Sequence, residues 1–198
     1  MRCIAWARSV LLGACVAFAG EAAAGVKVSE KTRSYEVAGK TGEALLASMD
    51  RHGPKHGFLT RAIAQTRYSV SWTIEWGETR AACRVKSIDG ELDITYTYPS
   101  AHGLSSGLER RWNRFLAGVK KHENTHGDMA RQMARAVEKS VAKLSINDDP
   151  GCRKTRSEVK RRTAAIYADY EARQIRFDAR EHSDGGKVEG LIKALVGR

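Results

Sequence analysis

Residues 122–126 read His-Glu-Asn-Thr-His, an H-E-x-x-H pattern in the middle of a helical pattern that spans residues 108–144. Residues four apart lie on one face of a helix, one turn above the other. His122 and His126 can therefore direct two imidazoles at one point, as two ligands of a zinc ion must. Glu123 follows at about 100° round the helix, and we predict it as the general base that takes a proton from water.

Apolar side chains continue the same helical face on both sides of the motif. They step by three or four residues, which is typical of a buried stripe: Trp112, Phe115, Val119, Met129, Met133 and Val137. The alternative interpretation of the motif is two core histidines hydrogen-bonded to carbonyls or carboxylates, with Glu123 as a solvated charge.

The first 24 residues have the pattern of a signal peptide. Arg2 and Arg8 give a positive start, residues 9–20 are apolar but too short to span a bilayer, and small residues follow. We predict cleavage after Ala24, with Ala19 as the second choice and lipidation at Cys15 as a further alternative. The pattern predicts a secreted or periplasmic protein without a transmembrane segment in its mature chain.

Cysteine usage agrees with export. Two of the 4 Cys lie in the predicted signal peptide, which leaves Cys83 and Cys152. We predict that they form a disulfide in an oxidising compartment, and the alternative is two buried thiols.

The formal net charge of +11 attracts anionic partners in general. Because the Lys and Arg residues are spread along helices with few aromatics between them, we expect no specific nucleic-acid binding. The charge allows weak attraction to anionic envelope polymers. No Gly-rich phosphate loop is present, which argues against a nucleotide cofactor.

Alternating apolar and polar residues predict strands at residues 34–38, 67–76, 82–88 and 92–98, with Asp89-Gly90 as a hairpin turn. Helical patterns cover residues 43–51, with Thr41 as its cap, 154–181 and 188–196. We predict an α+β fold in which an antiparallel β-meander packs on a long helical hairpin that carries H-E-x-x-H. Residues 25–182 would form one zincin-like domain, and residues 183–198 a C-terminal tail.

A zinc enzyme usually takes three protein ligands and keeps one position for water. Met129 and Gln132 stand where the metzincin extension has Gly and His, so the third ligand must come from elsewhere. In an antiparallel helical hairpin Glu171 or Asp178 would lie opposite the motif. Ligand chemistry favours His182, and Asp184 is a further alternative.

The chain also resembles a family of secreted bacterial proteins of unknown function that are regarded as zinc-dependent proteases. The residues that carry the resemblance are Tyr35-Glu36-Val37-Ala38-Gly39, Trp72, Trp76, Cys83-Arg84-Val85, Tyr96-Thr97-Tyr98-Pro99, Trp112-Asn113-Arg114-Phe115-Leu116, His122-Glu123, His126, Cys152 and Phe177-Asp178. The resemblance implies His122 and His126 as metal ligands and Glu123 as base. The family commonly has Thr-x-His-Gly after the aromatic-Asp pair, whereas this chain has Glu181-His182-Ser183-Asp184-Gly185.

These observations predict a secreted metallopeptidase with one Zn²⁺ ion, held by His122, His126 and His182, that acts on protein or peptide substrates. Two alternatives stay open. One is a cell-envelope binding protein without catalysis, either stapled by a metal or metal-free. The other is a metal-dependent amidase that acts on cell-wall material.

Overall fold

The computed structural model describes residues 25–56 and 60–197, so the predicted signal peptide and its cleavage sites lie outside the described residues. The elements follow in the order β1 (Val26–Val37), α1 (Gly42–His52), β2 (Lys55–His56), β3 (Thr60–Arg61), β4 (Gln65–Glu78), β5 (Ala82–Ala101), α2 (Ser106–Val141), β6 (Ser145–Asn147), a 3-10 turn η1 (Pro150–Cys152), α3 (Arg153–His182) and α4 (Lys187–Val196). The predicted α+β class is confirmed.

Three long strands form one layer, in the order β1-β5-β4, and β6 pairs with the start of β5. β4 and β5 form an antiparallel pair, whereas β1 runs parallel to β5 from Val26 opposite Gly90 to Val37 opposite Ala101. The sheet is therefore mixed, and the predicted antiparallel meander is wrong. The sequence pattern located parts of β1, β4 and β5, but it carries no information about the direction in which a distant strand pairs.

The predicted turn at Asp89-Gly90 is also wrong, because β5 runs straight through it. Gly90 lies opposite Trp72 of β4, and a Cβ atom at Gly90 would come within 2.6 Å of the Trp72 ring. Gly90 thus leaves room for an indole and does not make a turn. The actual reversal between β4 and β5 uses residues 79–81, where the Thr79 amide donates to the Ala82 carbonyl.

β1 begins well before the predicted strand at residues 34–38. Most of its side chains are exposed, so its first part shows no alternation of apolar and polar residues. Its backbone hydrogen bonds to β5 hold it, and these leave no mark in the hydrophobic pattern.

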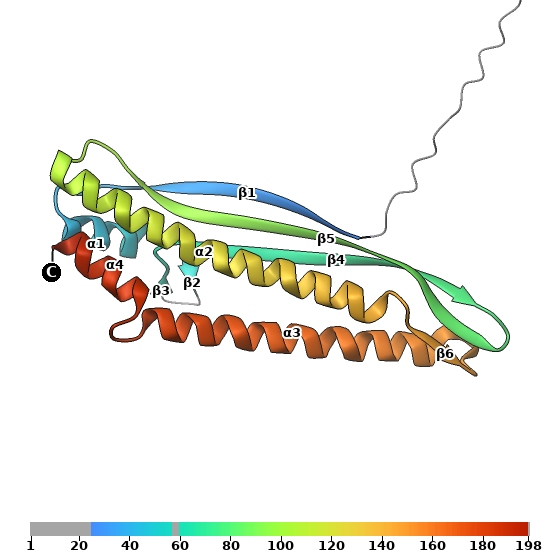
Figure 1. The fold of residues 1–198 in the computed structure, drawn as a ribbon. Helices are drawn as coiled ribbons and strands as arrows, with labels where there is room; N and C mark the ends of the chain where they lie inside the picture. Colours follow the sequence, from blue (N-terminus) through green and yellow to red (C-terminus); the bar gives the residue numbers. More distant parts are fainter. Residues whose placement is uncertain (1–24, 57–59, 198) are drawn as a thin grey trace, which may run out of the picture.

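α2 lies along the sheet with one side buried over its whole length (Figure 1). Trp112, Phe115 and Val119 pack with Leu92 and Ile94 of β5 in the main core. Val137 and Val141 pack with Val85 and Ile88 in a second cluster near the other end. The predicted apolar stripe of α2 thus belongs to its buried face, except Met129, which is only partly buried.

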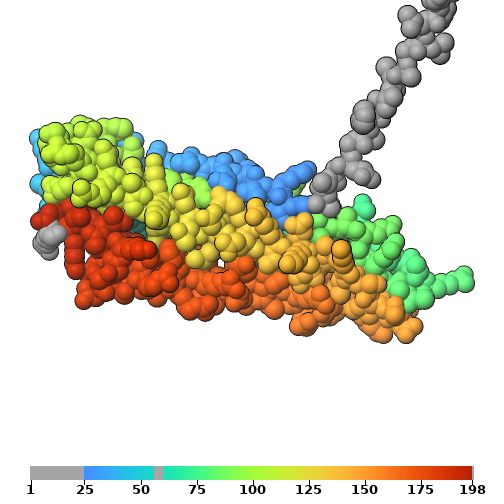
Figure 2. All heavy atoms as spheres, in the orientation of Figure 1, coloured from blue at the N-terminus to red at the C-terminus, as the bar shows by residue number. Residues whose placement is uncertain are grey.

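α3 lies beside α2, and Figure 2 shows the two helices as neighbouring bands along the length of the molecule. Only Thr155, Val159, Phe177 and Glu181 of α3 are buried. α4 confirms the predicted helix at residues 188–196, and its Leu195 is fully buried in the main core.

Cys83 and Cys152 form the predicted disulfide, which joins β5 to η1. Asp149 fixes the same junction: its carboxylate accepts hydrogen bonds from the backbone amides of Lys154 and Thr155 and from the Thr155 hydroxyl. Within the described part of the chain, every helix is too short or too polar to serve as a membrane span.

The disulfide joins residues 69 positions apart. Its loss should therefore greatly increase the conformational entropy of the unfolded chain. We expect the Cys83→Ser/Cys152→Ser variant to lose about 2–5 kcal/mol of unfolding free energy, measured by urea denaturation. Reduced wild-type protein is the control and should match the variant. Equal urea midpoints for oxidised and reduced protein would contradict a stabilising crosslink.

Gly127 is the residue of α2 that lets the helix approach β5, because a Cβ atom there would lie 2.0 Å from the Tyr96 hydroxyl oxygen. We expect Gly127→Ala to lower the unfolding free energy by about 1–3 kcal/mol through overpacking. Gly107→Ala on the same helix is the matched control, because nothing lies within 4 Å of its Cβ position. That variant should be neutral or stabilised by up to about 1 kcal/mol. Similar values for the two variants would rule out the close approach.

Candidate metal centre

The H-E-x-x-H residues lie near the middle of α2, on its buried side. His122 and Glu123 are 8% and 7% exposed, so neither side chain is a solvated surface group. The Nε2 atoms of His122 and His126 are 3.2 Å apart. The helical spacing therefore brings the two imidazoles together, as the sequence predicts.

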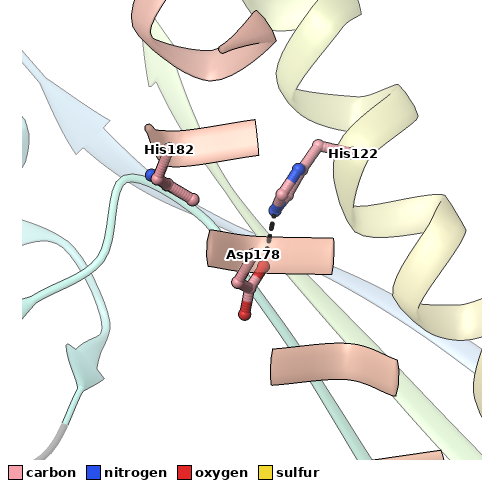
Figure 3. Close-up of side chains that lie close together, drawn as sticks. All are labelled: His122, Asp178 and His182. Atoms are coloured by element: carbon pink, nitrogen blue, oxygen red, sulfur yellow. Dashed lines mark ion pairs between the residues drawn. The ribbon is translucent and has the colours of Figure 1, made fainter. Parts of the chain in front are cut away.

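α3 supplies the groups that face these imidazoles. Figure 3 shows His122 directed at Asp178, with His182 one turn further along α3. The Asp178 Oδ1 atom lies 3.2 Å from His122 Nε2 and 2.8 Å from His126 Nε2. Ligand atoms of His122, Asp178 and His182 all lie within 4.8 Å of one another.

Phe177 closes one side of the cluster. Its ring stacks on His122 with 4.8 Å between centroids and meets the His126 ring edge-on at 5.2 Å. An apolar wall of this kind excludes water and strengthens electrostatic interactions beside it.

The triangle formed by the two Nε2 atoms and Oδ1 fits one face of a tetrahedral zinc site. Zinc–nitrogen and zinc–oxygen bonds of about 2.0–2.1 Å place neighbouring tetrahedral ligand atoms about 3.3 Å apart. The three observed separations are 3.2, 3.2 and 2.8 Å. The residues present are therefore of the right type and spacing to hold a divalent ion.

The hydrogen bonding of His126 supports the same fit. Its Nδ1 donates to the Gln174 Oε1 atom, which leaves Nε2 to carry a proton or a metal ion. An outer partner of this kind orients most metal-binding histidines. His122 differs, because its buried Nδ1 has no hydrogen-bond partner among the described residues.

Burial and the contacts between these groups shift the pKa values of Asp178, His126 and His182. Burial would raise the pKa of Asp178, but hydrogen bonds from His122 and His126 hold it well below its usual range. Burial lowers the pKa of His126, but hydrogen bonds to Asp178 and Gln174 outweigh it and raise the value overall. Burial, aided by the charge of His122, lowers the pKa of His182.

The Glu123 carboxylate is positioned by a strand. The Thr66 hydroxyl of β4 donates to Glu123 Oε2 at 2.6 Å and lies 3.0 Å from the Glu123 carbonyl oxygen. The negative charge of Glu123 acts on both His126 and His182, opposing the effect of burial on their pKa values. The Glu123 carboxylate is therefore held at Thr66 of β4, within range of the charges of these two imidazoles.

Two of the alternative third ligands lie elsewhere. Glu171 lines a separate hollow together with Tyr68 and Met133. Asp184 is 98% exposed and lies 3.7 Å from Lys193. Asp178 and His182 are thus the predicted candidates that the fold brings to His122.

Sequence reasoning did not single out Thr66 or Gln174 as site residues. Gln174 lies four residues before Asp178 on one face of α3, a spacing that could have indicated it. Thr66 continues the alternating row of Tyr68 and Val70 on β4, but the link between that row and Glu123 exists only in the folded chain.

A comparison with family models finds one match, over residues 32–186, to the family described as "Bacterial protein of unknown function (DUF922)". Neither the curated proteins nor the solved structures contain a match. The matched segment includes the H-E-x-x-H motif, Asp178 and His182, and it covers more than half of the chain. The chain therefore belongs to the DUF922 family of bacterial proteins of unknown function.

Proposed function

We propose that this protein is a secreted, zinc-dependent hydrolase of peptide bonds. The observation that carries the proposal is the triangle of His122 Nε2, His126 Nε2 and Asp178 Oδ1, with edges of 2.8–3.2 Å, beside the Glu123 carboxylate. Helices α2 and α3 together would form the frame of the metal site, with the H-E-x-x-H motif on one and Asp178 and His182 on the other.

His122 and His126 are two ligands in this proposal, and Asp178 or His182 is the third. Asp178 already lies at ligand spacing from both imidazoles. Burial is the main cause that lowers the pKa of His182, which favours the neutral imidazole that a metal ligand needs. With three protein ligands the fourth position stays open to water and substrate.

A bound zinc ion supplies Lewis acidity, which makes water more acidic and polarises a carbonyl group. Glu123 accepts the proton of the attacking water and passes it to the departing amine. Thr66 holds the Glu123 carboxylate in one orientation, and Gln174 holds the His126 ring. Phe177 keeps bulk water from one side of the imidazoles.

The proposed location is outside the cytoplasm, as the N-terminal signal pattern predicts. The Cys83–Cys152 disulfide supports it, because structural disulfides persist in oxidising compartments.

A second candidate is a metal-stapled envelope protein without catalysis. The specific observation in its favour is that His122, His126, Asp178 and His182 supply four possible ligands. Four protein ligands would close the coordination shell, which is typical of structural zinc sites. The number of protein ligands therefore separates the two candidates.

Metal content tests the site directly. We expect about one zinc per chain in protein purified without chelator, measured by mass spectrometry of the metal, and none in the His122→Ala/His126→Ala variant. His102→Ala is the control, because His102 is exposed and pairs with Glu36 instead. If wild-type protein contains no zinc and added zinc does not stabilise it, the two histidines are core residues and not metal ligands.

Two single variants assign the third ligand. Loss of a true ligand should weaken zinc binding by more than about 100-fold, beyond the effect of removing an outer hydrogen-bond partner. In the enzyme proposal, either Asp178→Asn or His182→Ala has this effect, and the other variant has a smaller one. Equal, severe losses in both, measured by chelator competition, would favour the closed structural site.

Glu123→Gln tests catalysis apart from metal binding. We expect peptide cleavage to fall by about 100- to 10,000-fold while zinc content stays unchanged, in a peptide-library assay. Glu109→Gln, on the exposed side of α2, is the control and should retain activity. Cleavage of cell-wall amides but not of peptides would indicate an amidase. If Glu123→Gln keeps the biological activity of the wild type, the result would favour a binding protein without catalysis.

A further inference from the structure

A hollow of about 300 Å³ lies between β4, α2 and α3. Its walls are mainly apolar or aromatic, with one carboxylate: Tyr68, Ser69, Val70, Met133, Tyr167 and Glu171. None of these residues belongs to the candidate metal cluster.

The hollow adjoins that cluster through Gln174. The Gln174 side chain accepts a hydrogen bond from His126 and donates one to the Tyr68 hydroxyl at 3.4 Å. Along β4 the same alternating row passes from Thr66, which holds Glu123, to Tyr68 and Val70 in the hollow. The two sites are therefore neighbours along both the strand and the helix.

Glu171 is the charged group of the hollow, and it differs from the other acids of α3. Glu158, Asp169, Asp178 and Glu181 each face an Arg, Lys or His side chain within 4 Å. Glu171 has no such partner among the described residues. Its carboxylate is thus free to pair with a cation from outside the chain.

Distance along α3 relates this carboxylate to the reacting centre. Glu171 precedes Asp178 by seven residues, or about 10 Å along the helix axis. An extended peptide advances about 3.3 Å per residue. A long side chain one or two residues from the scissile bond can therefore span the gap.

We propose that the hollow is a specificity pocket that receives a lysine or arginine side chain of the peptide substrate. The aliphatic stem of such a side chain would lie against Val70 and Met133 while its charged end meets Glu171. Tyr68 and Tyr167 offer aromatic faces, which also attract cations. The inference rests on the proposed peptide hydrolysis at His122 and His126 and names the substrate class for it.

The net charge of +11 does not favour a cationic ligand. Charges beyond about 8 Å are largely screened at physiological ionic strength, however. Selection of a basic side chain would therefore depend on direct contact with Glu171, and a change at that one position should alter it.

The test compares cleavage of matched peptides that carry Lys, Arg, Leu or Glu at each position near the scissile bond. We expect the zinc-loaded protein to prefer Lys or Arg at one position by about two- to fivefold in kcat/KM, the scale of one exposed ion pair. Glu171→Gln should lower kcat/KM for the Lys and Arg peptides to the value for the Leu peptide measured with the same variant, and Glu171→Lys should shift the preference towards Glu. Asp169→Asn is the matched control, because Asp169 pairs with Arg173 on the same helix, and it should keep the preference.

Binding of the same peptides to the zinc-loaded Glu123→Gln variant, measured by fluorescence anisotropy, gives an answer that needs no turnover. Basic peptides that bind in a Glu171-dependent way but are never cleaved would keep the pocket and overturn the protease proposal. Cleavage without preference for basic residues, or with a preference that Glu171→Gln leaves unchanged, would overturn the pocket and keep the protease. Neither cleavage nor Glu171-dependent binding would overturn both.

Discussion

Burial of one side of α2 is the constraint on which the other parts of this protein depend. The helix contacts the sheet along its length, and α3 and α4 pack against it in turn. Close packing of a helix on a sheet fixes the positions of the buried side chains, because each of them has few alternative rotamers. His122 and Glu123 belong to that buried side, so the candidate site is held by the core and not by loops.

Burial also brings polar groups of the candidate site close together. Two imidazole nitrogens and a carboxylate oxygen meet within 3.2 Å of one another beside Phe177. Lone pairs brought so close repel unless protons or a metal ion lie between them. In the structure hydrogen bonds and ion pairs link these atoms, and in the proposed function a metal ion would take the place of the shared protons.

The two ends of the helix pair serve different purposes. Near residue 150 the disulfide and the Asp149 hydrogen bonds fix the chain where it passes from α2 to α3. Towards the other end, Asp178 of α3 reaches the motif on α2, and Glu171 faces the hollow between them. α3 buries few residues of its own, but Val159, Ile166 and Tyr167 pack in the second core cluster. These apolar contacts, the polar contacts and the crosslink together hold α3 on α2.

Local pattern determined much of this protein: the long helix with H-E-x-x-H on its apolar face, the strands at residues 67–76 and 92–98, the capped helix at residues 43–51 and the pairing of two remaining cysteines. Helical spacing is enough to bring His122 to His126, because both lie on one helix. Only the tertiary structure decided that β1 pairs parallel to β5, that Gly90 makes room for Trp72, and that Asp178 rather than Glu171 faces the histidines. Those outcomes depend on contacts between segments far apart in the chain, and periodicity within one segment carries no information about its distant partner.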